Sequence, residues 1–389
     1  MFKDGWPLWS SVFVLQGENM EQINYQETVE QRLIEKATLL HSPINGILEL
    51  TPLCNMNCNM CFVRLNSREL ANKGSTLDGE EWISIAEEIR KAGTLFVLLT
   101  GGEPLLHPDF RSIYTALKKM GMILTVNTNG TLIDEEWADF FAQYLPRRIN
   151  ITLYGANEST YQRLCHYPDG YQKARKAIKL LLERHIDVKI NGTITPKNIE
   201  DLDGMFSIAG KYDTAWKFDT YLFPACRERS AGFNNRSRLS PQEAAKARVK
   251  IMQEKEQERF AQTASDFVKM GNAPAGNEIP LPMQCHAGKS SFFINWQGMI
   301  RPCVFMSYPE FDVKEMGFQE GWNNIVEAVS AIRLNAKCST CTMRNVCQTC
   351  AACAVSETDS FGEIPEYMCR YTKETIRLLK EKANQKENN

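Results

Sequence analysis

Three cysteines early in the chain form the first group whose spacing could do chemistry. Cys54, Cys58 and Cys61 read Cys-x3-Cys-x2-Cys and directly follow a short apolar segment. Three thiolates this close together can bind three irons of a cube-shaped iron–sulfur cluster, which needs four ligands. Because the next cysteine is Cys165, one iron would stay open for a small molecule. Zinc is the alternative, and it would take a fourth Cys or His, for which His41 is the nearby candidate.

A glycine-rich turn ends the next apolar segment. It reads Gly101-Gly102-Glu103-Pro104. Glycines allow a ligand to approach the backbone closely, and a carboxylate can hold an ammonium group. The cysteine loop and this turn each follow a predicted strand, and ligands of βα barrels gather at the carboxyl ends of the strands. We therefore expect the two groups to meet at one rim.

A second cysteine group occupies the last third of the chain. Its members are Cys285, Cys303, Cys338, Cys341, Cys347, Cys350, Cys353 and Cys369. These are enough for two clusters with four thiolate ligands each, and two structural zinc sites are the alternative. Of the 13 cysteines, Cys165 and Cys226 are then left over. We expect Cys165 to be a small buried apolar residue in a helix and Cys226 to be structural.

Composition narrows the class of protein. The chain has 389 residues, of which 43% are hydrophobic and 24% charged, so it is not a disordered polymer. A formal net charge of −2 gives no general attraction to nucleic acid or to an anionic membrane. No apolar run reaches the roughly 18 residues of a membrane-spanning helix. Clustered cysteines without an export signal predict a cytoplasmic protein whose thiols stay reduced.

Six short apolar segments alternate with longer periodic ones in the first half of the chain. The predicted strands are Ile47–Leu50, Leu95–Leu99, Ile123–Val126, Ile149–Leu153, Val188–Ile194 and Trp216–Leu222. Trp82, Ile85, Ala86 and Ile89 share one face of the first intervening helix. Alternation of this kind predicts parallel strands joined by right-handed crossovers. We therefore expect an α/β fold, a partial (β/α)6 barrel with a small cysteine-rich C-terminal iron–sulfur domain.

The domain boundaries follow from changes in composition. We expect an N-terminal extension over 1–42, the barrel over 43–224, a connecting helix and linker over 225–282, a cluster domain over 283–375 and a charged tail over 376–389. The stretch Ser240–Gln262 predicts an exposed helix with Ser240 as N-cap and Pro241 at its first position. The cysteine-rich part has few long periodic segments, so we expect metal rather than an apolar core to order it.

The cysteine loop, the glycine turn and the six βα units together resemble the radical S-adenosylmethionine (SAM) enzymes. The resemblance covers roughly residues 45–224. It implies that Cys54, Cys58 and Cys61 hold a [4Fe–4S] cluster whose open iron binds the amino and carboxylate groups of SAM. Gly101, Gly102 and Glu103 would hold the methionine amino group. Reductive cleavage would release a 5′-deoxyadenosyl radical that removes a hydrogen atom from the substrate.

Three further positions are carried over from the same resemblance. Thr128, Thr152 and Lys189 match positions that contact the ribose or the carboxylate of SAM in related enzymes. The alternative is that the threonines are simply good strand formers and that Lys189 is an exposed edge charge. No catalytic acid or base can be chosen. Asp219 and Tyr221 lie two apart on the predicted sixth strand and are expected to share a face.

The second cysteine group resembles the SPASM extension of radical SAM enzymes, which holds two auxiliary [4Fe–4S] clusters. The resemblance implies a distal cluster on Cys338, Cys341, Cys347 and Cys369. It implies a proximal cluster on Cys285, Cys303, Cys350 and Cys353. The usual family spacing puts a cysteine at position 351, where this chain has Ala351. It therefore stays open whether both Cys350 and Cys353 bind iron.

The resemblance further implies a peptide or protein substrate, such as a ribosomally made precursor, and oxidation or crosslinking of it. A flavodoxin or ferredoxin would be the reductant, and neither nucleic acid nor membrane is an expected partner. Arg227 and Arg229 could contact an acidic substrate at the barrel mouth. The alternatives are a radical dehydrogenase or rearrangement enzyme for a small metabolite and, outside enzymes, a zinc-stapled interaction protein.

Overall fold

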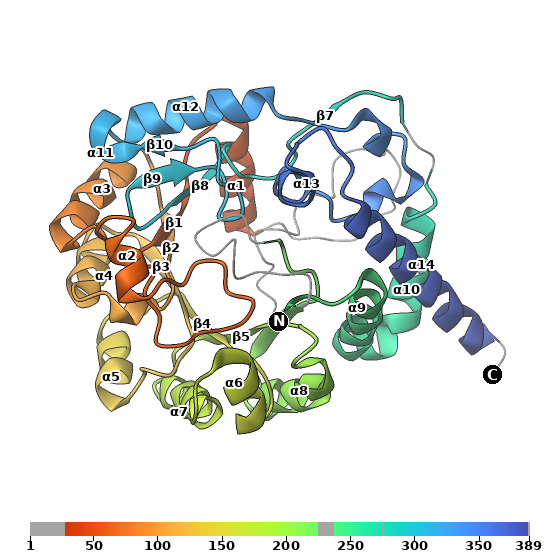
Figure 1. Cartoon of the computed structure of the whole chain (residues 1–389), viewed down its shortest axis with the longest axis horizontal. Coiled ribbons are helices and arrows are strands. Elements are labelled where there is room, and N and C mark those ends of the chain that lie inside the picture. The colour runs from red at the N-terminus through yellow and green to blue at the C-terminus, as the bar shows by residue number, and fades with distance from the viewer. Residues whose placement is uncertain (1–27, 225–236, 274–275, 388–389) are drawn as a thin grey trace.

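The computed structural model describes residues 28–224, 237–273 and 276–387 (Figure 1). Its centre is a curved sheet whose first six strands are parallel and pair in sequence order. They are β1 (Asn45–Glu49), β2 (Phe96–Thr100), β3 (Ile123–Thr128), β4 (Arg148–Thr152), β5 (Val188–Thr193) and β6 (Ala215–Asp219). All six predicted strands and the open (β/α)6 barrel are thus confirmed.

Helices between the strands cover the outside of this sheet (Figure 1). They are α3 (Gly79–Lys91), α4 (Phe110–Lys119), α5 (Glu135–Gln143), α6 (Glu158–Cys165), α7 (Gly170–Glu183) and α8 (Leu202–Lys211). Asp78 caps α3 in a reciprocal pair with Glu81, which satisfies two backbone donors at the helix start. The predicted face of α3, including Trp82 and Ile89, is fully buried. Asp134 caps α5, as its position predicts.

The cysteine-rich part extends the barrel sheet, which the sequence did not predict. Strands β8 (Ser291–Ile294), β9 (Met299–Arg301) and β10 (Phe311–Asp312) join the sheet beside β1, and β8 runs parallel to β1. Gly46 on β1 makes room for this, because a Cβ there would lie 2.7 Å from the ring of Phe292. The expectation that metal alone orders this part was wrong for β8–β10, whose apolar side chains join the main core.

Helices α11 (Val313–Met316) and α12 (Phe318–Ala331) run along the same edge of the sheet (Figure 1). The buried face of α12 includes Phe318, Trp322 and Ile325. The indole nitrogen of Trp322 donates to the backbone oxygen of His41 at 2.9 Å. The C-terminal region is therefore attached to the barrel by backbone pairing and by a shared apolar core.

Three helices pack together on the opposite side of the molecule (Figure 1): α9 (Pro241–Glu256), α10 (Phe260–Met270) and α14 (Glu366–Glu387). Ser240 caps α9 and Pro241 is its first residue, as predicted. The helix is not exposed as expected, because Ala244, Ala245 and Ala247 are buried. Helix α14 is one continuous element, so the expected boundary between 375 and 376 falls inside it.

The described ranges also contain shorter helices and strands. They are α1 (Val29–Leu39), α2 (Ser67–Ala71), α13 (Ala351–Thr358), the strands β7 (Leu281–Pro282) and β11 (Arg333–Leu334), and the 3-10 helices η2 (Pro104–Leu106), η3 (Ile199–Asp201), η6 (Gln257–Arg259), η7 (Ala336–Cys338) and η8 (Thr342–Asn345). Strands β7 and β11 form a separate antiparallel pair.

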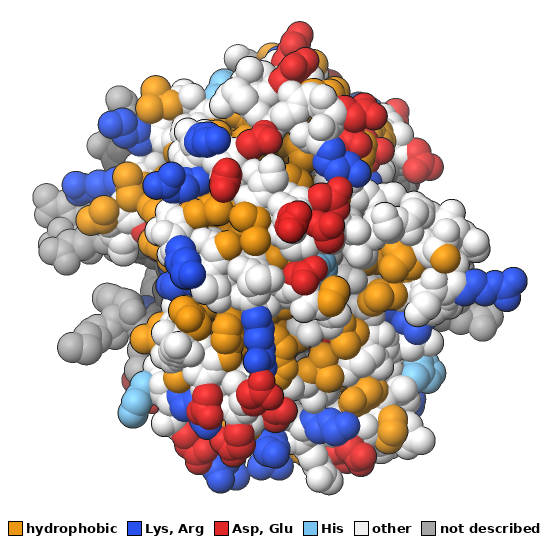
Figure 2. Space-filling view, turned by 90° about the vertical axis from the view of Figure 1, so that its left-hand side faces the viewer, with side chains coloured by type: hydrophobic (Ala, Val, Ile, Leu, Met, Phe, Trp, Pro, Cys, Tyr) orange, Lys and Arg blue, Asp and Glu red, His pale blue; other side chains and the backbone are white. Residues whose placement is uncertain are grey.

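The surface carries mixed charge. On the face in Figure 2, acidic and basic side chains of the described residues are interspersed with small apolar areas. Across the described ranges, every helix is too short or too polar to cross a membrane.

Candidate active site

The loop with Cys54, Cys58 and Cys61 leaves the carboxyl end of β1 and is anchored to the end of α6. The backbone nitrogens of Asn57 and Asn59 donate to the carbonyl oxygens of Cys165 and Leu164, each at 2.9 Å. The Cys165 side chain is fully buried, as expected. The last turn of α6 therefore fixes the middle of the cysteine loop, using carbonyl groups that a helix end leaves unpaired.

The Gly101–Pro104 turn is held against the same loop. The Gly102 nitrogen donates to the Thr51 oxygen at 2.6 Å, and the Glu103 nitrogen donates to the Leu53 oxygen at 2.8 Å. A Cβ on Gly102 would lie 2.4 Å from the Leu53 carbonyl oxygen. The sequence argument explained the glycines by close approach of a ligand. In the structure it is the backbone of the cysteine loop that approaches them.

Glu103 is fully buried at the meeting point of the two segments. One carboxylate oxygen accepts from the Thr128 hydroxyl at 2.8 Å and from the Leu105 nitrogen at 3.2 Å, and the other accepts from the Asn129 nitrogen at 2.8 Å. Burial raises the pKa of Glu103 to about 7, against the lowering effect of these hydrogen bonds. Glu103 has no ion-pair partner among the described residues, so a cation beside it would relieve this desolvation.

Asn129 joins this site, although the sequence argument singled out Thr128 from the same Asn127–Gly130 run. Its side-chain nitrogen donates to Asn55 Oδ1 at 2.9 Å and lies 3.8 Å from Cys54 Sγ. The side-chain oxygen of Asn129, Oδ1, accepts from the Thr131 hydroxyl at 2.6 Å. An Asn after a strand, two residues before a Thr, is a common turn signal, so the sequence alone did not mark its contact with the cysteine loop.

The structure brings Thr128 and Thr152 to one rim but not Lys189. Thr128 ends β3 and pairs with Ile151, so Thr152 at the end of β4 lies one residue beyond it. Lys189 pairs with Asn150 and lies four residues before the end of β5. It is therefore in the opposite half of its strand, away from Glu103.

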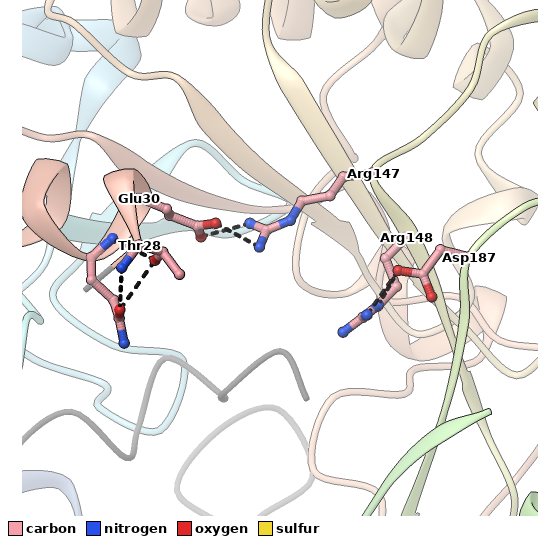
Figure 3. Close-up of polar contacts among 6 residues, drawn as sticks. Thr28, Glu30, Arg147, Arg148 and Asp187 are labelled. Atoms are coloured by element: carbon pink, nitrogen blue, oxygen red, sulfur yellow. Dashed lines mark hydrogen bonds and ion pairs between the residues drawn. The ribbon is translucent and has the colours of Figure 1, made fainter. Parts of the chain in front are cut away.

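Lys189 is buried rather than an exposed edge charge. Burial, together with the nearby Lys217 and Arg148, lowers the pKa of Lys189 to about 8. Arg148 itself pairs with Asp187 at 2.7 Å, at the amino ends of β4 and β5 (Figure 3). The same figure shows the pair of Arg147 and Glu30 of α1. The Arg147 guanidinium donates two hydrogen bonds to the Glu30 carboxylate, each at 2.7 Å.

The thiols of the first group have the chemistry of cluster ligands. Burial first, and then the Glu103 carboxylate, hold the pKa of Cys54 well above its usual value. A hydrogen bond with Cys165 and burial do the same for Cys58. Such thiols keep their protons until a metal supplies positive charge, and a coordinating thiol is deprotonated outright.

An iron–sulfur cluster and a single metal ion require different arrangements of the three thiol sulfurs. In the part of the chain that the structure describes, no three Cys, His, Asp or Glu side chains are grouped as around one metal ion. In a cube-shaped cluster each thiolate binds a different iron, so the three sulfurs need not meet at a point. The loop offers three thiols that form no disulfide, and thiolates are the ligands that iron–sulfur clusters take.

Neighbouring cysteines of the second group affect the thiols of Cys369 and Cys338. Burial raises the pKa of Cys369 to about 11, with further contributions from Cys347, Cys338 and Cys341. Burial also raises the pKa of Cys338, with Cys347 and Cys341 adding to it. The thiols expected for the distal cluster are therefore within electrostatic reach of Cys369 in α14, although Cys338 ends η7 and Cys341 and Cys347 flank η8.

Three of the thiols expected for the proximal cluster, Cys285, Cys350 and Cys353, lie within electrostatic reach of the start of α13. Burial and then Cys285 raise the pKa of Cys350 to about 12. The Cys350 sulfur accepts from the Cys353 nitrogen at 3.4 Å, and the Cys303 sulfur accepts from the Phe305 nitrogen at 3.4 Å. Cys353 is fully buried, and burial followed by Cys350 raises its pKa.

Aromatic side chains connect the two cysteine groups. Phe62, next to Cys61, lies 5.4 Å from the ring of Phe305, which stacks on Phe223 at 4.1 Å and an interplanar angle of 8°. Phe223 in turn meets the ring of Tyr221 at 4.8 Å. The segment after β6 thus lies between the first cysteine loop and the second group.

Three sequence expectations concern this segment. Strand β6 ends at Asp219, so Asp219 and Tyr221 do not share a strand face as predicted. Asp219 is exposed and pairs with Lys217 at 3.0 Å, whereas Tyr221 reaches α13. Cys226, Arg227 and Arg229 lie outside the described residues.

Comparison with known proteins places two family models on this chain. The radical SAM superfamily model matches residues 48–208, and the SPASM iron–sulfur cluster-binding domain matches residues 285–354. The first range contains the cysteine loop, the glycine turn, the end of β1 and the four barrel strands β2 to β5. The second contains seven of the eight cysteines of the second group and ends before Cys369.

Similar proteins differ in what their names say they act on. An AdoMet-dependent heme synthase of Methanosarcina barkeri is 24% identical over 83% of this chain and 95% of its own. A PqqA peptide cyclase of Xanthomonas oryzae pv. oryzae is 24% identical over 79% of this chain and 80% of its own.

A solved structure has a similar fold. Streptococcus suis SuiB bound to the precursor peptide SuiA superposes with a TM-score of 0.65 and 16% identity, covering 92% of this chain and 84% of SuiB. With both models matched in order on one chain, the protein carries a radical SAM domain followed by a SPASM iron–sulfur domain, and its cofactors are [4Fe–4S] clusters and SAM.

Proposed function

We propose that this radical SAM enzyme removes a hydrogen atom from a peptide or protein and so oxidises or crosslinks it. Cys54, Cys58 and Cys61 would hold the cluster that binds SAM. The observation that carries the proposal is the junction of the cysteine loop with the Gly101–Pro104 turn, where the buried Glu103 carboxylate lies within electrostatic reach of Cys54.

The chain's own residues would bind and orient SAM at this junction. When bound and reduced by one electron, SAM supplies a 5′-deoxyadenosyl radical. Glu103 would accept hydrogen bonds from the methionine amino group, because its carboxylate is buried and has no ion-pair partner among the described residues. Gly101 and Gly102 keep the turn against the cysteine loop, while Thr128 fixes the carboxylate.

Thr152 would contact the cofactor from the end of β4, beside Thr128. For Lys189 the support is weaker than for the other positions, because its strand register separates it from Glu103.

We propose two auxiliary clusters in the C-terminal part. Cys338, Cys341, Cys347 and Cys369 would hold the distal one, and Cys285, Cys303, Cys350 and Cys353 the proximal one. Cys369 is within electrostatic reach of Cys338, Cys341 and Cys347, which supports grouping these four. Cys347 is also within reach of Cys353, so the division between the two clusters follows the family resemblance. When bound, such clusters supply one-electron acceptors, which an oxidation of the substrate radical requires. A flavodoxin or ferredoxin would deliver the electron that starts each turnover.

A peptide substrate is supported by two of the similar proteins. The Xanthomonas relative is named a peptide cyclase, and SuiB was solved with its precursor peptide. We also place the enzyme in the cytoplasm, where thiols stay reduced; none of the described cysteines forms a disulfide.

A small substrate is the second candidate, either for a dehydrogenation or for a rearrangement. It is favoured by the Methanosarcina relative, which is named a heme synthase. The alignment with this chain covers 95% of that relative's length. The two candidates share the cofactor site and differ in what enters the barrel.

Two measurements test these proposals on the reconstituted enzyme. The first is the iron content of Cys369→Ala, which we expect to fall by about four irons per chain. Cys226→Ala is the control, because it also removes a thiol but one that is not a proposed ligand. Unchanged iron in Cys369→Ala would contradict the distal assignment.

The second measurement is the mass of candidate substrates after coexpression with the enzyme. Peptides encoded beside its gene should become lighter by the mass of the hydrogen atoms removed when they are coexpressed with the native enzyme. They should keep their masses when coexpressed with Cys58→Ala. If all peptides keep their masses while an iron-porphyrin precursor is converted, the peptide proposal is wrong and the second candidate holds.

A further inference from the structure

Tyr221 connects the end of the barrel to the second cysteine group. Its hydroxyl lies 3.3 Å from the sulfur of Cys353 and donates to Glu357 Oε1 at 2.8 Å. Cys353 and Glu357 are four residues apart on α13, so they share one face of that helix. One phenol hydroxyl therefore faces both a sulfur and a carboxylate.

Glu357 is held in place independently of Tyr221. Arg238 donates to both of its carboxylate oxygens, at 2.6 and 3.1 Å, and the two side chains are only 11% and 9% exposed. The Arg238 guanidinium also lies 4.1 Å from the ring centre of Tyr367. The hydroxyl of Tyr367 donates to the Leu239 oxygen at 2.8 Å and does not contact a sulfur.

The hydrogens at this contact can be counted. A phenol has one hydrogen to donate, a thiol also has one, and a thiolate has none. While Cys353 is a thiol, it can donate to the Tyr221 oxygen, and Tyr221 can donate to Glu357. Once Cys353 is an iron-bound thiolate, two buried acceptors compete for the Tyr221 hydrogen. Because Arg238 already neutralises Glu357, the Tyr221 hydrogen can be shared between Glu357 Oε1 at 2.8 Å and the Cys353 sulfur at 3.3 Å.

We propose that Tyr221 is a positioning residue that donates a hydrogen bond to the Cys353 sulfur and thereby raises the reduction potential of the proximal cluster. Reduction adds negative charge to a cluster, and a donor at a ligand sulfur stabilises the reduced form more than the oxidised one. The inference rests on the proposed function, because it requires Cys353 to be a ligand.

The test is a reduction-potential titration of the reconstituted holoenzyme followed by electron paramagnetic resonance. The proximal signal is the one that disappears in Cys353→Ala. In Tyr221→Phe, its midpoint should shift to a lower potential while the signals of the other clusters keep theirs. Tyr367→Phe is the matched control: it removes a neighbouring phenol hydroxyl that binds a carbonyl, and all midpoints should stay unchanged.

A second variant protects the test against poor folding of Tyr221→Phe. Incorporation of 3-fluorotyrosine at position 221 keeps the ring and makes the hydroxyl a stronger donor, so the proximal midpoint should shift upward. If both changes at position 221 leave the iron content and the proximal midpoint unchanged, the inference is overturned and the cluster assignment stands. If Cys353→Ala keeps all its iron, the ligand assignment is wrong and the inference falls with it.

Discussion

The Thr128 hydroxyl donates to the Glu103 carboxylate at 2.8 Å, although the two residues follow different strands. Thr128 ends β3, and Glu103 lies three residues beyond the end of β2. The bond ties two neighbouring ends of the barrel sheet at the place where the cysteine loop meets the glycine turn. In this structure Thr128 therefore orients the buried Glu103 carboxylate.

Replacing Glu103 with Gln should weaken SAM binding about 10- to 100-fold, since a hydrogen bond to a charged group contributes about 1.5 to 3 kcal/mol. The amide keeps the size of the side chain but removes the negative charge that would hold an ammonium group. The measurement is the Kd of SAM for the reconstituted enzyme. Glu136→Gln, an exposed carboxylate in an ion pair with Arg111, is the control and should keep the native Kd.

The advantage of the native enzyme over Glu103→Gln should depend on pH. Because the pKa of Glu103 is raised to about 7, much of it is neutral below that pH in the absence of ligand. Binding of an ammonium group favours the charged form and releases that proton, so the native Kd should rise as the pH falls through 7. The ratio of the two Kd values should therefore shrink from pH 8 to pH 6. A constant ratio would mean that Glu103 carries the same charge throughout.

Gly102→Ala should disturb the first cluster. The added Cβ would lie 2.4 Å from the Leu53 carbonyl oxygen and would push the cysteine loop away from the turn. Overpacking of this kind costs about 1 to 3 kcal/mol of the free energy of unfolding. Formation of 5′-deoxyadenosine should fall at least about tenfold.

Gly210→Ala is the matched control for Gly102→Ala. A Cβ at Gly210 in α8 has no neighbour within 4 Å, and alanine is the better helix former by about 1 kcal/mol. Its stability should be equal or higher, and its activity unchanged. Equal activity of the two alanine variants would show that the fit between turn and loop is not required.

The buried pair of Arg238 and Glu357 should contribute far more to stability than the exposed pair of Arg147 and Glu30 in Figure 3. Glu357→Ala leaves a nearly buried guanidinium without a partner, which costs about 3 to 5 kcal/mol. Glu30→Ala removes a pair whose side chains are 34% and 42% exposed, worth about 1 kcal/mol or less. Denaturant unfolding of the two variants compares them. Similar losses would show that burial does not determine the difference.

Local patterns predicted the barrel because its strands and helices carry their signals in their own sequence. The Trp82 to Ile89 face of α3 and the Asp134 cap of α5 are examples. Strand β8 has no such signal. It is four residues long and pairs with β1, about 250 positions away in the chain, so its place in the sheet depends on tertiary packing. The size of the sheet and the role of α12 were missed for the same reason.

The pairing register of neighbouring strands also could not be predicted from the sequence. Periodicity placed Thr152 and Lys189 on strands, but only the pairing register shows that Thr152 lies opposite Asn191 and Lys189 opposite Asn150. Lys189 therefore lies two residues further from the rim than Thr152. Asn129 and Tyr221 were missed or misplaced because their contacts, with Cys54 and Cys353, join segments far apart in the chain.

The most direct test concerns Cys54, Cys58 and Cys61 together. The enzyme with all three replaced by alanine should be reconstituted without oxygen, reduced with dithionite and assayed for 5′-deoxyadenosine from SAM. We predict no product above the level without enzyme, while the auxiliary clusters keep about eight irons per chain. Undiminished 5′-deoxyadenosine from the triple variant would contradict the account, because SAM cleavage would then not depend on the cluster that these cysteines are proposed to hold.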